Sequence, residues 1–400
     1  MAALLTLRLK RGRGKHFLKG HPWLFAGDII PTSEHLLAQP GELAQIVDQK
    51  GRVMAIGYFN ARAQLAFRKL SSAPEPIEQN FFIERLRIAL DKRTKAFPEP
   101  YYRLVHAEGD NLPGLIIDRF GDTCVLQVAT WGIERLLPQV IEALDRLISP
   151  KAIVLRNDFA ARELEGLPRE VKLLRGIVPP WVEVHENGAI YYADLMNGQK
   201  TGWFYDQRDN RALVATRAEG RTVLDLYCNA GGFGILAAKN GARRVTLVDS
   251  SALALELAHE SARKNGVEDL CTFRKSDARA AMEAFAREKT RFGIVVVDPP
   301  AFIKRKEDIE PGLKAYTTLA REAAMLVEDG GLLMIASCSH NASRPRFREA
   351  VMTGIKQTGR LATVLNYSGH GTDHPVHPHL PQSEYLKALL IRCQDGYPEK

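Results

Sequence analysis

The chain has 400 residues, of which 45% are hydrophobic and 26% are charged, with 31 glycines and 21 prolines. This length allows two or three domains, and the ordinary composition excludes a disordered chain, a collagen-like repeat and a disulfide-rich miniature scaffold. The net charge of +8 is unevenly placed, because residues 1–70 hold 11 Lys and Arg against 4 acids. A local basic region on a near-neutral body favours a phosphate backbone as partner over the simpler interpretation of a solvated surface.

Neither a membrane nor a metal is expected. No apolar stretch approaches the roughly 20 residues of a membrane-spanning helix. Residues 1–5 place apolar side chains before the basic ones, the reverse of a secretory signal. The five cysteines are scattered and odd in number, without the spacing of metal ligands or of a disulfide framework. We therefore expect a reducing, cytoplasmic location.

Two N-terminal domains are predicted by changes in pattern. Short alternating runs at 5–10, 41–47, 52–58 and 63–70, separated by Gly, Pro and Asp, predict a small β-rich domain over 1–72. A linker, Ser-Ser-Ala-Pro-Glu-Pro, follows. Residues 73–184 predict a central α+β domain. Its expected helices cover 80–97 and 133–147, and its expected strands cover 102–106, 114–118, 124–129 and 152–155.

Regular alternation of strands and helices begins near residue 185 and predicts a doubly wound, mainly parallel sheet over 185–400. The expected strands are 222–226, 245–249, 271–275, 293–298 and 332–337, and the expected helices are 252–265, 278–288, 312–326 and 344–356. Two further strands, at 361–365 and 386–392, have no helix between them. We expect them to form an antiparallel hairpin at one edge of the sheet.

Acidic residues at successive strand ends predict a cofactor site. The first strand leads into Asp-Leu-Tyr-Cys-Asn-Ala-Gly-Gly-Phe-Gly, beginning at Asp225. A pyrophosphate would be repelled by this acid, whereas a ligand with an ammonium and a sulfonium group would be attracted. Asp249 can accept ribose hydroxyls, and Asp277 can accept an adenine amino group. The simpler interpretation is that glycines mark a turn and acids cap helices. The joint pattern favours S-adenosylmethionine, held by Asp225, Asn229, Ala230, Gly231, Gly232, Phe233, Asp249, Ser250, Asp277, Ala278 and Asp298.

Two further motifs predict the reaction. Asp298-Pro-Pro-Ala-Phe302 follows the fourth strand, where Asp298 can contact a base edge and Phe302 can stack on a flipped base. Ser-Cys-Ser, centred on Cys338, follows the fifth strand. A cysteine there is usually a core residue. Beside an acid, however, its thiolate can add to carbon 6 of a pyrimidine and so make carbon 5 nucleophilic.

With these motifs the sequence resembles the class I methyltransferases with a PUA domain that make 5-methylcytosine in large-subunit ribosomal RNA. The resemblance covers essentially the whole chain. It is carried by His-Pro-Trp-Leu-Phe from residue 21, by residues 109–121, by residues 197–211 and by Asp-His-Pro-Val from residue 373. It implies that Cys338 is the nucleophile and that the cofactor site is bordered by Lys200, Phe204, Asp206, Gln207 and Arg208.

The resemblance also implies ribosomal RNA as the partner. The contacts that we expect with it are Lys10, Arg11, Arg13, Lys15, Lys19, Phe302 and Lys304. A homodimer is one option that the sequence leaves open. His370, His374, His377 and His379 would be a candidate metal cluster, but prolines interrupt the spacing and we expect no metal.

Three alternatives stay open. Uracil-5 methyltransferases also pair an Asp-Pro-Pro loop with a cysteine, so the base could be uracil. The loop after Asp298 contains no second cysteine, so the group that removes the carbon-5 proton is open as well. Asp-Pro-Pro-x-Phe also suits methylation of an exocyclic amine, which needs no thiol. A non-catalytic RNA-binding assembly factor would bind the cofactor without turnover.

Overall fold

The computed structural model describes residues 4–396 of the chain, and its fold divides into two compact units that interleave along the sequence. Unit 1 comprises Met1–Val182, Asp194–Trp203 and Thr372–Ser383, and unit 2 comprises Glu183–Ala193, Phe204–Gly371 and Glu384–Lys400. The division into domains 1–72, 73–184 and 185–400 stays a prediction. The first and last residues of the predicted domains, 1–3 and 397–400, lie outside the described residues.

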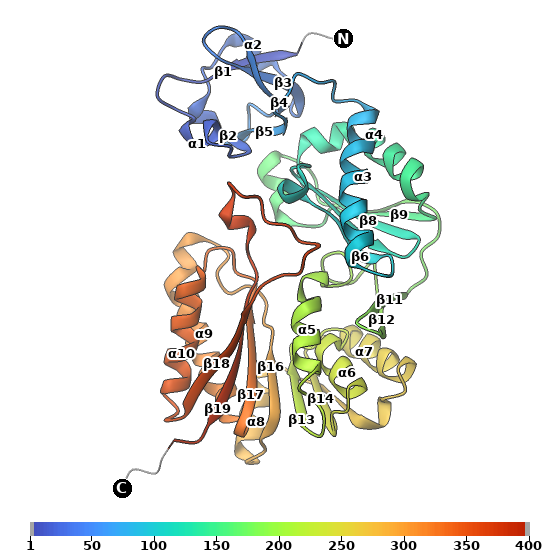
Figure 1. Cartoon of the computed structure of the whole chain (residues 1–400), viewed down its shortest axis with the longest axis vertical. Helices are drawn as coiled ribbons and strands as arrows, with labels where there is room; N and C mark the ends of the chain where they lie inside the picture. The colour runs from blue at the N-terminus through green and yellow to red at the C-terminus, as the bar shows by residue number, and fades with distance from the viewer. Residues whose placement is uncertain (1–3, 397–400) are drawn as a thin grey trace. The chain divides into compact units, whose positions relative to one another are not determined.

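Unit 1 begins with a five-stranded sheet in the order β1-β3-β4-β5-β2 (Figure 1). Its strands are β1 (Leu5–Arg8), β2 (Trp23–Phe25), β3 (Glu42–Val47), β4 (Val53–Phe59) and β5 (Leu65–Ser71), and its short helices are α1 (Lys15–Leu18) and α2 (Ser33–Leu37). β1 pairs with β3 in parallel, and the other pairs are antiparallel. Four of the strands lie within two residues of the predicted runs. The three-residue strand β2 is too short to show alternation and was not predicted.

A second sheet in unit 1, in the order β10-β9-β8-β7-β6, shares its core with the first. Its strands are β6 (Tyr101–His106), β7 (Leu115–Phe120), β8 (Thr123–Val128), β9 (Ala152–Arg156) and β10 (Val171–Arg175), and its helices are α3 (Gln79–Ala96) and α4 (Trp131–Ile148). Tyr58 of β4 packs on Gly132 so closely that a Cβ atom there would lie 2.0 Å from the ring. The Tyr58 hydroxyl donates to the carbonyl oxygen of Pro113 at 2.8 Å. The two sheets are therefore one packed body.

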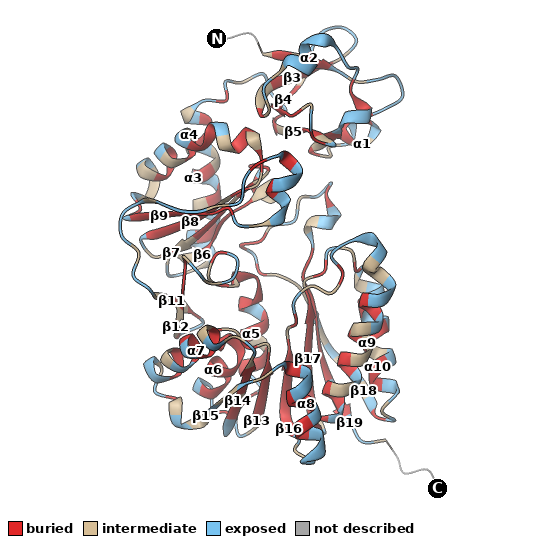
Figure 2. Ribbon diagram, turned by 180° about the vertical axis from the view of Figure 1, so that it is seen from behind, coloured by how far each residue is buried: buried red, intermediate tan, exposed pale blue. Residues whose placement is uncertain are grey.

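Unit 2 is built on a seven-stranded sheet in the order β15-β14-β13-β16-β17-β19-β18. The strands are β13 (Thr222–Leu226), β14 (Arg244–Asp249), β15 (Cys271–Lys275), β16 (Phe292–Val297), β17 (Val327–Ser337), β18 (Leu361–Ser368) and β19 (Lys387–Gln394). The helices are α5 (Arg208–Ala215), α6 (Gly232–Lys239), α7 (Ala252–Lys264), α8 (Ala278–Arg287), α9 (Ile309–Met325) and α10 (Arg344–Lys356). Helices cover the sheet, and its central strands are buried (Figure 2).

The predicted parallel sheet with an antiparallel edge hairpin is confirmed. The five strands from β15 to β17 run parallel, and β19 is antiparallel to both β17 and β18. A separate hairpin of β11 (Val182–Glu186) and β12 (Ala189–Ala193) precedes the sheet, and the backbone N–H of Tyr192 donates to Ser261 Oγ on α7 at 3.0 Å. Among residues 4–396, no helix has the length and apolar character needed to cross a membrane.

Candidate functional site

A sharply bent loop joins β13 to α6 at the carboxyl edge of the unit 2 sheet. Tyr227, Asn229 and Gly231 have left-handed backbones, with φ angles of 61°, 48° and 79°. Position 231 requires glycine, because a Cβ atom would also lie 2.5 Å from Cδ1 of Ile235. Ala230, Gly232 and Phe233, which the sequence places at the cofactor site, are buried in this turn. The loop thus places the first turn of α6 next to the carboxyl end of β13.

Asp225 is the buried acid of this loop, with 1% of its surface exposed. Its Oδ2 accepts the backbone N–H of Gly234 at 2.8 Å, while its Oδ1 has no hydrogen-bond partner among the described residues. Burial raises the pKa of Asp225 to about 7, and the charges of Asp298 and Asp249 add to the rise. Oδ1 of Asp225 can therefore accept a hydrogen bond from a ligand. A positively charged ligand would also stabilise the ionised form of this carboxyl group.

Asp249 ends the neighbouring strand, β14. Its Oδ2 accepts the backbone N–H of Asn229 and its Oδ1 accepts that of Ser251, each at 2.9 Å. Each oxygen keeps a second lone pair, as hydrogen bonds from ribose hydroxyls require. The adjacent Ser250 is exposed.

Asp277 caps α8, as the simpler interpretation of the sequence expected. Its Oδ1 accepts the backbone N–H groups of Arg279 at 2.9 Å and Ala280 at 3.2 Å. Ala278 is buried in the first turn of that helix. The contact of Asp277 with adenine stays a prediction.

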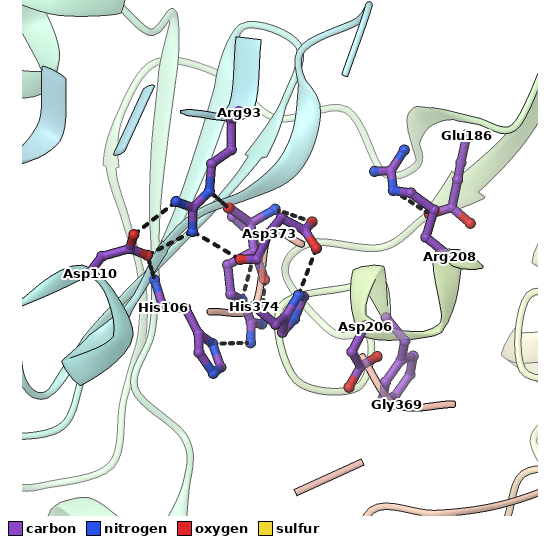
Figure 3. A network of polar contacts seen from close by, with 12 residues as sticks. Arg93, His106, Asp110, Glu186, Asp206, Arg208, Gly369, Asp373 and His374 are labelled. Carbon is purple, nitrogen blue, oxygen red and sulfur yellow. Dashed lines mark hydrogen bonds and ion pairs between the residues drawn. The ribbon is translucent and has the colours of Figure 1, made fainter. Parts of the chain in front are cut away.

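The segment before the loop is fixed by buried ion pairs. Arg211 of α5 pairs with Glu186 at 2.6 Å, donates to the carbonyl oxygen of Phe204 at 3.0 Å and lies over the Phe233 ring. Arg208 lies 3.8 Å from Glu186, and both residues are shown in Figure 3. Arg211 thus connects this segment to the first turn of α6.

The predicted residues Asp206, Gln207 and Arg208 are all buried in unit 2. Asp206 Oδ2 accepts the Tyr385 hydroxyl at 2.6 Å, and Gln207 Oε1 accepts the amide of Asn210 at 2.6 Å. Lys200, predicted beside them, belongs to unit 1. The interactions of this segment with a cofactor stay predictions.

Two loops meet at the ends of β16 and β17. These parallel strands are neighbours, with Val297 opposite Ile335, so Asp298 and Cys338 follow adjacent strand ends. The backbone N–H of Ile303 donates to Ser339 Oγ at 3.2 Å, and the Cys338 thiol lies 4.0 Å from the carbonyl oxygen of Pro299. Both predicted reacting groups, Asp298 and Cys338, are partly exposed.

Tyr316 supports both loops from α9. Its hydroxyl lies 3.0 Å from Ser339 Oγ and accepts Ser337 Oγ at 2.8 Å. The Phe302 ring, predicted to stack on a base, packs against Tyr316 at 4.8 Å between centroids, and Lys304 is exposed. The base contact of Phe302 and the RNA contact of Lys304 stay predictions.

A buried lysine that was not predicted stands beside the cysteine. Lys387 of β19 lies opposite Ser337 and is 1% exposed. Its Nζ donates to the carbonyl oxygens of Ser339 at 2.6 Å and Ala342 at 2.8 Å, which fixes the segment after Cys338. Burial lowers the pKa of Lys387 to about 8, and the Cys338 thiolate opposes this by raising it. The same attraction favours the thiolate form of Cys338.

The predicted basic residues of the N-terminal region lie in unit 1. Lys10, Arg11, Arg13, Lys15 and Lys19 are all exposed, and none forms an ion pair within residues 4–396. Asp28 shapes their loop, because its carboxylate accepts the backbone N–H groups of Gly14 at 3.2 Å and Phe25 at 3.0 Å. The loop therefore presents its positive charges to solvent.

One of the candidate metal histidines, His374, is the buried partner of an aspartate. His374 pairs with Asp373 at 2.8 Å and is 1% exposed, and Asp373 also accepts the backbone N–H of Arg103 at 3.1 Å. Arg93 binds Asp110 through two hydrogen bonds, at 2.8 and 2.7 Å (Figure 3). No group of side chains within residues 4–396 has the arrangement of a metal site.

The predicted carboxylates fit a cationic ligand. Asp225, Asp249 and Asp298 follow β13, β14 and β16, which are neighbours in the sheet, and the charges of the other two raise the pKa of Asp225. The buried Oδ1 of Asp225 offers an acceptor where an ammonium group could donate. The chemistry of these side chains therefore suits S-adenosylmethionine.

Two family descriptions match the chain. Residues 7–72 match a PUA-like domain, and residues 168–392 match an S-adenosylmethionine-dependent methyltransferase. Two similar proteins, from Tolumonas auensis and Aeromonas hydrophila, are named ribosomal RNA large subunit methyltransferase I. They are 35% identical over 395 residues and 33% identical over 398 residues, each covering 97% of this chain and 99% of the relative.

Solved structures agree on the fold. SMU.776, a methyltransferase complexed with SAH, superposes with a TM-score of 0.83 at 21% identity, covering 97% of this chain and all 100% of the other. A SAM-dependent methyltransferase from Streptococcus mutans gives a TM-score of 0.81 at 21% identity with the same coverage. Both therefore support the fold described above.

Proposed function

Because this chain belongs to the family of S-adenosylmethionine-dependent methyltransferases, we propose that it methylates carbon 5 of a cytosine in large-subunit ribosomal RNA through a covalent adduct with Cys338. The observation that carries the proposal is the pairing of Cys338 and Asp298 at adjacent strand ends, with the buried amine of Lys387 beside the cysteine.

Ribosomal RNA is supported by the names of the relatives, which match along nearly their whole length, and by the PUA-like domain. The exposed positive charges between residues 10 and 19 suit a phosphate backbone. A ribosomal substrate is consistent with the predicted cytoplasmic location.

The thiol is needed because carbon 5 of cytosine is a weak nucleophile. The Cys338 thiolate adds to carbon 6, forming a carbon–sulfur bond and moving an electron pair to carbon 5. S-adenosylmethionine, when bound, supplies the methyl group that this carbon accepts. The carbon-5 proton then leaves to a base, the double bond between carbons 5 and 6 re-forms, and the Cys338 thiolate is expelled. The cysteine is thus regenerated.

The side chains around Cys338 support two parts of this reaction. Lys387 stabilises the attacking and leaving thiolate as a buried cation. Asp298, in its protonated form, donates to the ring nitrogen of cytosine and so stabilises the negative charge that the adduct develops. Asp225 and Asp249 hold the methyl donor through its ammonium group and ribose hydroxyls.

The test is to trap the adduct on a target RNA that contains 5-fluorocytosine. Fluorine cannot leave carbon 5 as a proton does, so the expected product is a denaturation-resistant protein–RNA adduct that forms only with S-adenosylmethionine. The Cys338→Ala variant should form no adduct and should not methylate RNA, while its cofactor affinity, measured by calorimetry, should stay within about twofold because little volume is removed.

The control is Cys228→Ala. The Cys228 thiol is 5% exposed, and burial raises its pKa well above the usual range, so it is unsuited to attack. This variant should still form the adduct. A Cys338→Ala enzyme that methylates RNA at a near-normal rate would contradict the covalent mechanism and favour exocyclic-amine methylation. Trapping by 5-fluorouridine RNA alone would favour uracil, and cofactor binding without any turnover would favour an assembly factor.

A further inference from the structure

Unit 1 contains a cavity of about 450 Å³ that the proposed methyl-transfer site does not use. It is lined by the end of β5 and the following loop, by α3, by the turn after β6, and by His377. Its polar side chains include Lys69, Arg85 and Asn111. The cavity is therefore large enough for a nucleotide-sized group and is equipped with hydrogen-bond donors.

The two acids of the cavity are already engaged. Glu75 lies 3.9 Å from Arg85 and accepts the hydroxyl of Ser71. Glu108 accepts the indole N–H of Trp23 at 2.8 Å and lies 3.9 Å from Arg68. Neither carboxylate pairs with Lys69.

Lys69 is a half-buried cation without an ion pair within residues 4–396, and it lies over the Phe17 ring at 5.8 Å. Burial lowers the pKa of Lys69. Burial also lowers the pKa of His21 and that of His377, and repulsion from Lys69 and His379 lowers both further. An anion bound here would stabilise the charged forms of Lys69 and of the neighbouring imidazoles.

A row of rings starts at His21, whose charge interacts with that of Lys69. His16 lies 5.0 Å from His21 and 6.0 Å from Phe25, and His21 lies 5.5 Å from Trp23, measured between centroids. Phe25 is 40% exposed. The rings belong to α1, β2 and the turn between them, next to β5 (Figure 1). The basic residues between positions 10 and 19 lie in the same helix, α1, and in the residues on either side of it.

We propose that these residues form a binding site for single-stranded RNA, in which Lys69 and the neighbouring imidazoles hold a backbone phosphate and the exposed Phe25 ring, at the end of the row, stacks on an unpaired base. Stacking selects a single strand, because the bases of a duplex are already stacked on one another and its deep groove excludes side chains. The inference rests on the proposed RNA substrate but not on the covalent mechanism.

The first arm of the test measures the phosphate contact. The full-length protein is titrated into a short fluorescent single strand of mixed sequence, and anisotropy is recorded at several salt concentrations. Lys69→Gln should weaken binding about tenfold, as loss of a hydrogen bond to a charged group predicts. It should also reduce the salt slope by about 0.7, the value for one phosphate of a single strand.

Two variants control for fold and for general charge. Lys69→Arg keeps the cation and should retain most of the affinity, whereas Lys50→Gln, at an exposed turn outside the cavity, should change it by less than about twofold. If Lys69→Gln and Lys50→Gln behave alike, the cavity does not bind RNA. If inorganic phosphate binds the wild type but not Lys69→Gln, and RNA affinity is unchanged by the substitution, the site is for a free anion and the RNA proposal is wrong.

The second arm measures stacking. Phe25→Ala should weaken binding of the single strand about 5- to 100-fold, the range for loss of one stacked base. Binding of a hairpin duplex of equal length should not change. Leu36→Ala, at a residue 76% exposed on the same sheet domain, is the apolar control. Equal affinity for strand and duplex, or no effect of Phe25→Ala, would overturn the proposal. If no adduct forms with 5-fluorocytosine RNA but Lys69→Gln and Phe25→Ala weaken binding as expected, the covalent mechanism is wrong and the RNA-binding site stands.

Discussion

Replacing Asp225 with asparagine should change stability and cofactor affinity in opposite directions. Asp225 is buried, and its pKa of about 7 in the folded protein stands well above the 3.8 of an unperturbed aspartate. Between these values the folded protein keeps a proton that the unfolded chain has lost. Folding therefore takes up a proton in this range, and the contribution of Asp225 to stability falls as the pH rises from about 4 to about 7.

The size of this effect follows from the shift. At 1.36 kcal/mol per pKa unit, the two units between about pH 5 and about pH 7 correspond to a fall of about 3 kcal/mol, as an upper value. The asparagine side chain of the variant cannot ionise, so the free energy of unfolding of Asp225→Asn, measured relative to the wild type by urea denaturation, should rise by up to this amount over the same range. Because the other groups titrate in both proteins, their contributions cancel in the difference between the two free energies of unfolding.

Cofactor binding should show the opposite trend, because a cationic ligand requires the Asp225 carboxylate. Calorimetry should find that the wild-type affinity for S-adenosylmethionine falls as the pH drops below about 7, by up to tenfold per unit, with release of a proton on binding. Asp225→Asn should bind weakly, without this pH dependence. The control is Asp122→Asn, whose exposed carboxylate has a pKa lowered by hydrogen bonding to Lys151. A stability difference for Asp225→Asn that stays flat from about pH 5 to about pH 7 would refute the reasoning.

Two further predictions concern the neighbouring strand ends. Asp249→Ala should weaken S-adenosylmethionine binding by about 1–3 kcal/mol in calorimetry, because buried ribose hydroxyls lose their acceptor; unchanged affinity would remove Asp249 from the site. Lys387→Met should slow single-turnover methyl transfer at least about tenfold at neutral pH, with partial recovery as rising pH ionises Cys338, while cofactor affinity is kept. A pH–rate profile identical to that of the wild type would show that Lys387 only supports the fold.

The regular part of unit 2 was predictable because its strands and helices have strong periodicity. Buried parallel strands read as apolar runs, and β13 matches its predicted bounds for this reason. The partly exposed edge strand β15 and the helix α10 also match their predicted bounds. The start of β17 was predicted five residues late, because Gly330 and Gly331 interrupt its pattern. The short strand β2 and the exposed strand β10 lack a periodic apolar pattern altogether.

The packing of unit 1 could not be predicted in the same way. The sequence indicates a domain boundary near residue 72, yet Ile56, Tyr58 and Leu70 pack in the core of the second sheet. Removal of residues 1–72 would expose that core, which is why point substitutions are the better test of RNA binding. The contact between the two sheets depends on the fit of Tyr58 against Gly132, and no pattern in the local sequence predicts it.

The candidate site was predictable where a topological rule applies. The carboxyl ends of parallel strands meet at one edge, so Asp225, Asp249, Asp298 and Cys338 could be assigned to one crevice from the order of strands alone. Lys387 was not found, because β19 is antiparallel and its first residue, rather than its last, reaches that edge. The signal was a lysine in the otherwise apolar run over residues 386–391.

The antiparallel strand β19 resolves an electrostatic conflict at this edge. The acids that suit a cationic methyl donor follow β13, β14 and β16, on one side of β17, and they would oppose formation of a thiolate at Cys338. A parallel strand would end here with another loop, whereas β19 begins here and places Lys387 on the other side of β17. Lys387 Nζ donates to two carbonyl oxygens, and Glu384, the carboxylate that raises its pKa, is itself paired with Arg344, so much of the positive charge of Lys387 remains for Cys338. The order of strands thus separates the negative groups that bind the donor from the positive group that supports the nucleophile.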